Sequence, residues 1–214
     1  MNKTLKLALV IALLSLAGSA QKIAKPTLTP KPATETQTEL IKQGIALHDA
    51  KKYDEAAAKY EQVMGDISAT LDWVSGQLWA NSDKVGITGY CWGGKVVWQA
   101  VARFAAFDAG VAWYGRLSPP DPAAAAAGAP WPVDLADDLK APVLGLYAAD
   151  DRGIPLTSVE AMRGALARAG AQDSEIVVFP GAQHGFHADY RASYHAAAAH
   201  EGWSRLLALF DARL

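Results

Sequence analysis

The chain has 214 residues, of which 51% are hydrophobic and 20% are charged, and its formal net charge at pH 7 is -2. This composition excludes intrinsic disorder, which needs few apolar residues and a large net charge. It also argues against nucleic acid as a main partner, because no excess of basic charge is available to neutralise phosphates. The single cysteine, Cys91, excludes an internal disulfide and a multi-cysteine metal cluster.

Residues 1–20 are typical of an export signal. Lys3 and Lys6 give a positive start, and small residues follow the apolar run at residues 7–17. That run is too short to span a bilayer, which takes about 20 helical residues, so no stable membrane span is expected. If the signal is genuine, the protein is exported to the periplasm or the extracellular space. Residues 21–38, rich in proline and threonine, are predicted to form an extended linker.

Residues 39–64 have the pattern of a helical hairpin, with a turn at residues 51–54 and Asp54 as the N-cap of the second helix. The residues at the expected helix contacts resemble a single tetratricopeptide (TPR) repeat: Gly44, Leu47, Ala56 and Tyr60. About three stacked repeats are needed for independent stability, so one copy either docks on another part of the chain or stays an orphan. A TPR-type module that binds a protein partner is therefore one alternative for the function.

The composition changes near residue 65. All nine basic residues before it are lysines, whereas eight of the eleven after it are arginines, and all seven tryptophans follow it. Two domains of different character in one natural protein explain this change, as do two unrelated coding pieces that were joined. The sequence therefore predicts a domain boundary between the hairpin and residues 65–214.

From residue 66 the pattern alternates between helix and strand. Helices are expected at residues 66–79, 95–107, 156–169 and 196–214, and strands at residues 85–89, 109–114, 142–148 and 175–179, with an irregular segment at 119–132. This alternation predicts an α/β fold with about four parallel strands and helices on both faces of the sheet. Functional residues are then expected at the C-terminal ends of the strands.

Residues 89–93, Gly-Tyr-Cys-Trp-Gly, follow the first of these strands and begin a helix. They match the nucleophile elbow, a sharp turn with a glycine on each side of the nucleophile, with Cys91 in place of serine. The turn lifts the sulfur clear of the sheet at a helix N-terminus, where the helix dipole favours a thiolate. The alternative is a buried cysteine that acts as a small hydrophobic residue.

Two further strand ends carry residues that suit this nucleophile. Asp150 and Asp151 end the third strand, and His184 follows the fourth. Nucleophile, acid and histidine, each after its own strand, is the chain order of α/β-hydrolases. The histidine would move a proton between the sulfur and the leaving group, and the aspartate would orient its ring.

Residues 66–214 resemble the dienelactone hydrolase family. The matching motifs are GYCWGG at residues 89–94, DRGIP at 151–155 and GAQHGF at 181–186. The resemblance implies hydrolysis of a small-molecule ester or lactone through a Cys-His-Asp triad, with no metal or cofactor. It makes Cys91 the nucleophile, His184 the base and then the acid, and Asp151, four residues before a proline, the orienting acid. It also implies a cytoplasmic location if the N-terminal signal is not genuine.

The chain departs from the family before the nucleophile strand, where the family's first strands are not matched. Those strands carry a second oxyanion-hole donor, an acidic residue near the cysteine and part of the pocket. The Trp92 N–H supplies one donor, and loss of the other would cost about 10²–10³ in rate. The nucleophile strand would also become an exposed, apolar sheet edge. An inactive, truncated or chimeric hydrolase fragment is therefore the alternative to an active enzyme.

Three other patterns bear on the substrate and on cofactors. The arginine that helps to bind a carboxylate in lactone-cleaving members does not occur at residues 185–189, which argues against dienelactone itself as the substrate. Residues 89–95 fit most of a phosphate-binding P-loop, but Val96 stands where a hydroxyl would hold magnesium. A metal cluster of His184, His187 and Asp189 would have loose spacing and no accompanying zinc ligands.

Overall fold

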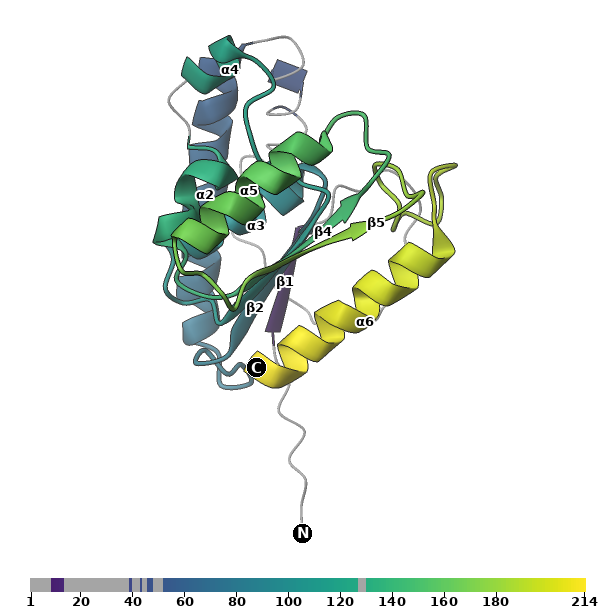
Figure 1. Cartoon of the computed structure of the whole chain (residues 1–214). Helices are drawn as coiled ribbons and strands as arrows, with labels where there is room; N and C mark the ends of the chain where they lie inside the picture. Colours follow the sequence, from purple (N-terminus) through teal and green to yellow (C-terminus); the bar gives the residue numbers. More distant parts are fainter. Residues whose placement is uncertain (1–8, 14–38, 40–42, 44–45, 48–51, 127–129) are drawn as a thin grey trace.

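The computed structural model describes residues 9–13, 39, 43, 46–47, 52–126 and 130–214. In these residues a parallel sheet has the strand order β1-β2-β3-β4-β5 (Figure 1). The strands are β1 (Leu9–Leu13), β2 (Val85–Tyr90), β3 (Ala109–Trp113), β4 (Val143–Ala148) and β5 (Glu175–Phe179). The helices are α2 (Tyr53–Ser75), α3 (Trp92–Arg103), α4 (Pro122–Ala126), α5 (Leu156–Arg168) and α6 (Ala196–Arg213), with a 3-10 helix, η1 (Pro132–Asp138). The predicted α/β fold, with four parallel strands and flanking helices, is confirmed.

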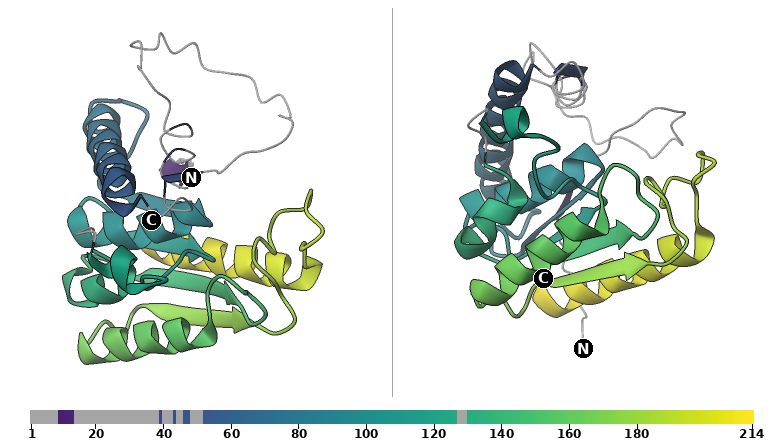
Figure 2. Two further views of the ribbon diagram at one scale, coloured as in Figure 1. Left: turned by 90° about the horizontal axis from the view of Figure 1, so that it is seen from above. Right: turned by 45° about the horizontal axis from the view of Figure 1, so that its top comes forward.

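Helices cover both faces of the sheet: α3 and α5 lie on one face and α6 on the other (Figure 2). Successive residues of a strand point to opposite faces. On β4, Gly145 faces the Trp98 side chain of α3, and the next residue, Leu146, packs against Gly202 of α6. This double coverage explains why β2, β3 and β4 are apolar along almost their whole length.

β1 comes from the segment that the sequence pattern assigned to an export signal. It pairs in parallel with β2, from Leu9 opposite Val85 to Leu13 opposite Gly89. The expectation that the nucleophile strand lies at an exposed edge is therefore wrong for this structure, because β2 has a neighbour on each side. A short apolar run suits a buried parallel strand as well as a signal segment, and its pattern does not separate the two. The rest of the predicted signal and the linker lie outside the described residues.

α2 runs without a break from Tyr53 to Ser75, so the two helices expected on either side of residue 65 are one helix. Gly65 lies inside it, exposed, and no neighbouring atom lies within 4 Å of the place where a Cβ would stand. The predicted domain boundary therefore falls within a helix. A change in amino-acid composition reflects how the gene evolved, whereas the continuity of a helix depends on the helix propensity of its residues and on their packing. The first helix and the turn of the predicted hairpin lie mostly outside the described residues.

α2 packs on α3 and belongs to the same hydrophobic core as the sheet. Val63 and Met64 are buried, and the ring centroid of Tyr60 lies 4.5 Å from that of Trp92. At the outer side, Arg103 Nη1 lies 2.7 Å from Glu61 Oε2. The part of α2 before residue 65 is thus joined to the sheet and α3 by buried apolar contacts.

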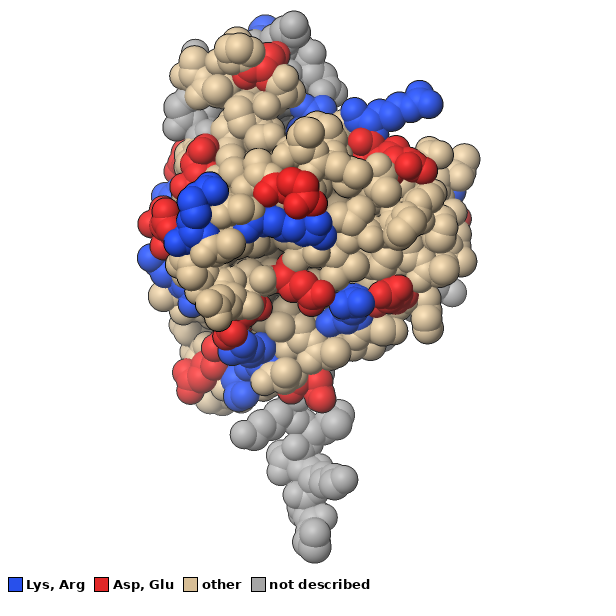
Figure 3. Space-filling model, in the orientation of Figure 1, with Lys and Arg blue, Asp and Glu red and all other residues tan. Residues whose placement is uncertain are grey.

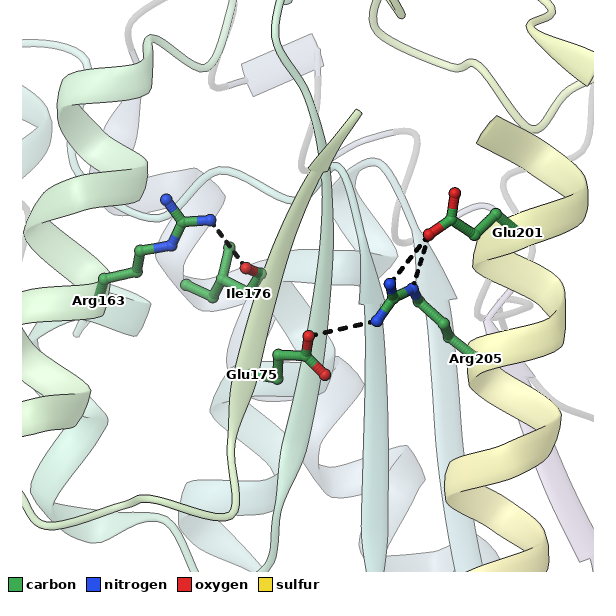
Figure 4. Close-up of polar contacts among 5 residues, drawn as sticks. All are labelled: Arg163, Glu175, Ile176, Glu201 and Arg205. Carbon is green, nitrogen blue, oxygen red and sulfur yellow. Dashed lines mark hydrogen bonds and ion pairs between the residues drawn. The ribbon is translucent and has the colours of Figure 1, made fainter. Parts of the chain in front are cut away.

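β5 is the edge strand opposite β1 in the described sheet, and arginines reach it from both layers of helices (Figure 4). Arg163 of α5 donates a hydrogen bond of 2.8 Å to the main-chain oxygen of Ile176. Arg205 of α6 lies 3.3 Å from Glu175 and 2.9 Å from Glu201. Because charged side chains cover this edge and the Ile176 carbonyl already accepts a hydrogen bond from Arg163, β5 is poorly suited to pairing with a strand of another chain.

The outer surface carries charge of both signs. On the face shown in Figure 3, lysine and arginine are interspersed with aspartate and glutamate. Among the described residues, no helix combines the length and the apolar character that a membrane crossing needs.

Candidate active site

The turn between β2 and α3 holds Cys91 in a strained backbone conformation, with φ of 55° and ψ of -119°. A non-glycine residue with positive φ costs of the order of 1–3 kcal/mol and needs support from its surroundings. Part of that support is the hydrogen bond of 2.9 Å from the Cys91 N–H to the carbonyl of Trp113 on β3. A Cβ at Gly89 would lie 2.4 Å from the carbonyl oxygen of Gly93, so the turn requires glycine there. This is the geometry expected of a nucleophile elbow.

The three residues selected from the sequence meet at the C-terminal ends of their strands. His184 Nε2 lies 3.1 Å from Cys91 Sγ, and His184 Nδ1 lies 2.7 Å from Asp151 Oδ2. The other oxygen of Asp151 accepts hydrogen bonds from the N–H groups of Gly153 and Ile154, at 2.8 and 3.2 Å. The Asp151 side chain is 1% exposed and that of His184 is 35% exposed. The buried carboxylate therefore fixes a ring that solvent and ligands can still reach.

The electrostatics of the site favour a thiolate beside an imidazolium. Burial acts to raise the pKa of the Cys91 thiol, but the hydrogen bond and charge of His184, the Trp92 N–H and the charge of Arg191 lower it below its ordinary value. Burial acts to lower the pKa of His184, but the hydrogen bonds to Asp151 and Cys91 raise it to about 9. Both shifts act in the direction that moves the shared proton from the sulfur to the ring.

Cys91, Trp92, Asp151 and His184 line a cavity of about 410 Å³, here called the first cavity. A cavity of this size suits a small organic ligand. The Trp92 N–H lies at the start of α3 and forms a hydrogen bond with the Cys91 sulfur. This position beside the sulfur is suitable for a donor to an oxyanion. The site residues predicted from the sequence, including Trp92, are thus brought together in the described structure.

Lys95 also lines the first cavity, and the sequence pattern did not select it as a site residue. It is 2% exposed, and its Nζ has no hydrogen-bond partner in the described part of the chain. The ammonium lies 3.5 Å from the ring centroid of Trp131 and 4.5 Å from that of Tyr60. Burial, with a smaller effect from the charge of Arg116, lowers the pKa of Lys95 to about 7.

A sequence signal for Lys95 did exist, since it lies four residues after Cys91 and so on the same side of α3. Trp131 had no such signal, because it lies in a segment expected to be irregular. Tyr60 was expected at the contact between the two helices of the hairpin, whereas it packs on Trp92 and lines the first cavity. These aromatic residues reach the cavity only through tertiary packing.

The metal interpretation of His184, His187 and Asp189 finds no support in the geometry. His184 is bonded to Asp151 and Cys91, and the ring of His187 lies 4.5 Å from that of Trp113. Within the described ranges, no group of three or more His, Cys, Asp and Glu side chains is arranged to hold a metal ion.

Comparisons with known proteins agree with the fold and the motifs. The sequence model of the Dienelactone hydrolase family matches residues 40–214. A Methylorubrum extorquens protein named "Putative carboxymethylenebutenolidase" is 48% identical over 145 residues, which cover 68% of this chain and 48% of that protein. An Escherichia coli protein with the same name is 45% identical over 150 residues, which cover 70% and 53%.

Solved structures give the same result. The crystal structure described as a "Putative Dienelactone Hydrolase" from Klebsiella pneumoniae is 45% identical, with a TM-score of 0.66, and the match covers 71% of this chain and 61% of that one. This chain spans about half the length of the curated relatives it matches. The family match covers most of the chain, including α2, and the chain belongs to the dienelactone hydrolase family.

Proposed function

We propose that the chain hydrolyses ester or lactone bonds of small molecules, with Cys91 as the nucleophile. The observation that carries the proposal is the continuous hydrogen-bonded series of Cys91 Sγ, His184 and Asp151 at the wall of the first cavity. The family of the chain supports hydrolysis as the type of reaction.

In the first half of the reaction, the Cys91 thiolate attacks the carbonyl carbon of the substrate, and the carbonyl oxygen becomes an oxyanion. The Trp92 N–H donates a hydrogen bond to that oxyanion. The intermediate collapses to a thioester on Cys91 as His184 gives its proton to the departing alkoxide. Asp151 holds the ring in place and stabilises its positive charge before the transfer.

In the second half, neutral His184 takes a proton from a water molecule, which attacks the thioester carbonyl. Collapse of this second intermediate releases a carboxylic acid and returns the thiolate and the imidazolium. The two bonds of His184, to Cys91 Sγ and to Asp151, support this alternation between base and acid. The predicted loss of a second oxyanion donor stays a prediction, because residues 14–38 lie outside the described part.

The proposal is tested by measuring hydrolysis of a chromogenic acetate ester and of a simple lactone with the full-length protein. Cys91→Ala removes the nucleophile, and we expect it to abolish turnover. Iodoacetamide should have the same effect, and its adduct can be assigned without ambiguity because the chain has one cysteine. Turnover that survives in Cys91→Ala would show that the nucleophile is assigned wrongly.

Two neighbouring carboxylates provide a matched comparison for the acid. Asp151→Asn should lower kcat by at least about 100-fold, since the ring of His184 loses its orienting partner. Asp150 is exposed, and the carboxylate that His184 Nδ1 contacts is that of Asp151, so Asp150→Asn should reduce kcat far less. Equal losses in the two variants would contradict the assignment of Asp151.

The place where the protein acts depends on the N-terminal segment. Cleavage after a signal at residues 1–20 would remove β1, whereas retention of this segment keeps the sheet as described. We propose export only for a chain whose signal is cleaved. Mass spectrometry of the protein recovered from separate cell fractions measures the mature N-terminus, and an intact Met1 would rule out cleavage.

A further inference from the structure

A second cavity of about 410 Å³ lies beside the first, and Cys91 and Tyr114 line both. The nucleophile therefore stands between two spaces of equal size. His184, Asp151 and Trp92 line the first cavity and are not among the residues that line the second. The proton donor and the oxyanion donor of the proposed reaction therefore face the first cavity and not the second.

The position of the proton donor determines which part of a substrate each cavity can hold. The oxygen of the leaving group must lie close to His184 Nε2 to receive its proton, and the oxyanion must lie close to the Trp92 N–H. Both groups line the first cavity, so the alcohol side of the ester lies there. The remaining substituent of the carbonyl carbon, the acyl group, is then directed into the second cavity.

Aromatic side chains dominate the wall of the second cavity. The ring of His187 lies 5.1 Å from that of Tyr90 and 5.9 Å from that of Trp203. Tyr190, Tyr194 and Trp203 are 55%, 43% and 42% exposed although they are large and apolar. Such rings at the wall of an open cavity are suited to stacking on a planar ligand.

The charges of the second cavity favour a neutral occupant. Asp189 and Arg191 both line it, and their charges offset each other. Burial lowers the pKa of His187, with a smaller opposing effect from Asp189, and so favours the neutral ring. The wall therefore offers aromatic surface and no excess charge.

We propose that the second cavity binds an aromatic acyl group, so that the substrates are esters of arylalkanoic acids; this inference rests on the proposed ester hydrolysis. The aryl ring packs against His187, Tyr194 and Trp203, while the alcohol part of the ester occupies the first cavity. The thioester formed on Cys91 then carries the aryl group in the second cavity until water releases it.

The test compares methyl phenylacetate with methyl cyclohexylacetate, two esters with the same leaving group and similar acyl size. We expect kcat/KM to be about tenfold higher for the aryl ester, since stacking depends on a planar ring. Trp203→Ala and Tyr194→Ala should each reduce this ratio towards one. Both side chains are partly exposed, so their removal leaves the core intact. Leu207→Ala is the control, because Leu207 is also an exposed apolar residue of α6, at 52%, and is not among the residues that line the cavity.

A binding measurement separates failure of this inference from failure of the proposed hydrolysis. Phenylacetamide is neutral and resists hydrolysis, and its binding can be followed by ligand-observed NMR on wild type, Trp203→Ala and Leu207→Ala. Weaker binding in Trp203→Ala alone supports the aromatic site even if no ester is turned over. A substrate ratio near one in the wild type, or equal phenylacetamide binding in all three proteins, would overturn it.

Discussion

Lys95 is buried and has no hydrogen-bond partner among the residues that the structure describes, which predicts that Lys95→Met stabilises the fold. In the unfolded chain the amine has its ordinary pKa of 10.5, and in the folded protein burial lowers the pKa to about 7. This difference corresponds to about 5 kcal/mol at low pH. The rings of Trp131 and Tyr60 face the ammonium, and their cation-π attraction is part of the balance that the folded-state pKa of about 7 expresses. Methionine keeps the length of the side chain and places a thioether against the same rings.

The direction of the pH effect follows from the lowered pKa. Below pH 7 both folded and unfolded states carry the charge, so the full cost of burying it is present. Between pH 7 and 10.5 the unfolded state keeps a proton that the folded state has lost, so wild-type stability rises with pH relative to the variant. Above pH 10.5 the cost has vanished. His184 is unchanged in the variant, so its own pH dependence cancels in the comparison.

Urea unfolding followed by tryptophan fluorescence at pH 6, 8 and 10 measures this effect. We expect Lys95→Met to be more stable by about 5 kcal/mol at pH 6, equivalent to about 10–20 °C in Tm, with the difference shrinking at each higher pH. A variant that is no more stable than wild type at pH 6 would refute the reasoning. So would a difference that stays constant up to pH 10.

Three further predictions use other parts of the structure. Gly89→Ala should lower the free energy of unfolding by about 3 kcal/mol or more, because its Cβ would stand 2.4 Å from a backbone oxygen. Gly65→Ala should raise it by about 0.5–1 kcal/mol, because Gly65 lies in the interior of α2 with free space around it. Urea unfolding measures both. The kcat/KM should fall above about pH 9, where His184 loses the proton that the leaving group receives, and a fall near pH 6.5 would contradict the raised pKa. Arg163→Ala should cost about 1 kcal/mol through the lost bond to the β5 carbonyl, and Arg205→Ala less than that, because its ion pairs are exposed; thermal unfolding that ranks them in the opposite order would contradict the role given to this bond.

The sequence predicted the fold class and the location of the site for a local reason. Parallel strands separated by helices have one geometry, and their C-terminal ends meet at one edge of the sheet. The elbow around Cys91 is likewise encoded in five consecutive residues, because only glycine fits at Gly89. The chain order of nucleophile, acid and histidine predicted Cys91, His184 and one of Asp150 and Asp151, and the resemblance to the family then selected Asp151. The structure places His184 3.1 Å from Cys91 and 2.7 Å from Asp151.

Local patterns were a weaker guide to the described residues before α3. Residues 9–13, which lie within the apolar run of the predicted signal, form β1 beside β2, and the change in composition at residue 65 leaves α2 unbroken. The pattern of a short apolar run does not indicate which strand it pairs with, and composition does not indicate where a helix ends. In both places the local structure depends on contacts with residues far away in the chain.

By itself, the sequence determined a mildly acidic α/β chain of 214 residues whose single cysteine lies in a nucleophile elbow. Only the tertiary structure decided what surrounds that cysteine. Tyr60 from α2, Lys95 from α3 and Trp131 meet in the first cavity, and the rings near His187 form the second. Motifs encode the reacting groups because those groups need fixed local geometry. Cavity walls are assembled from distant segments, and their chemistry appears only when the chain is packed.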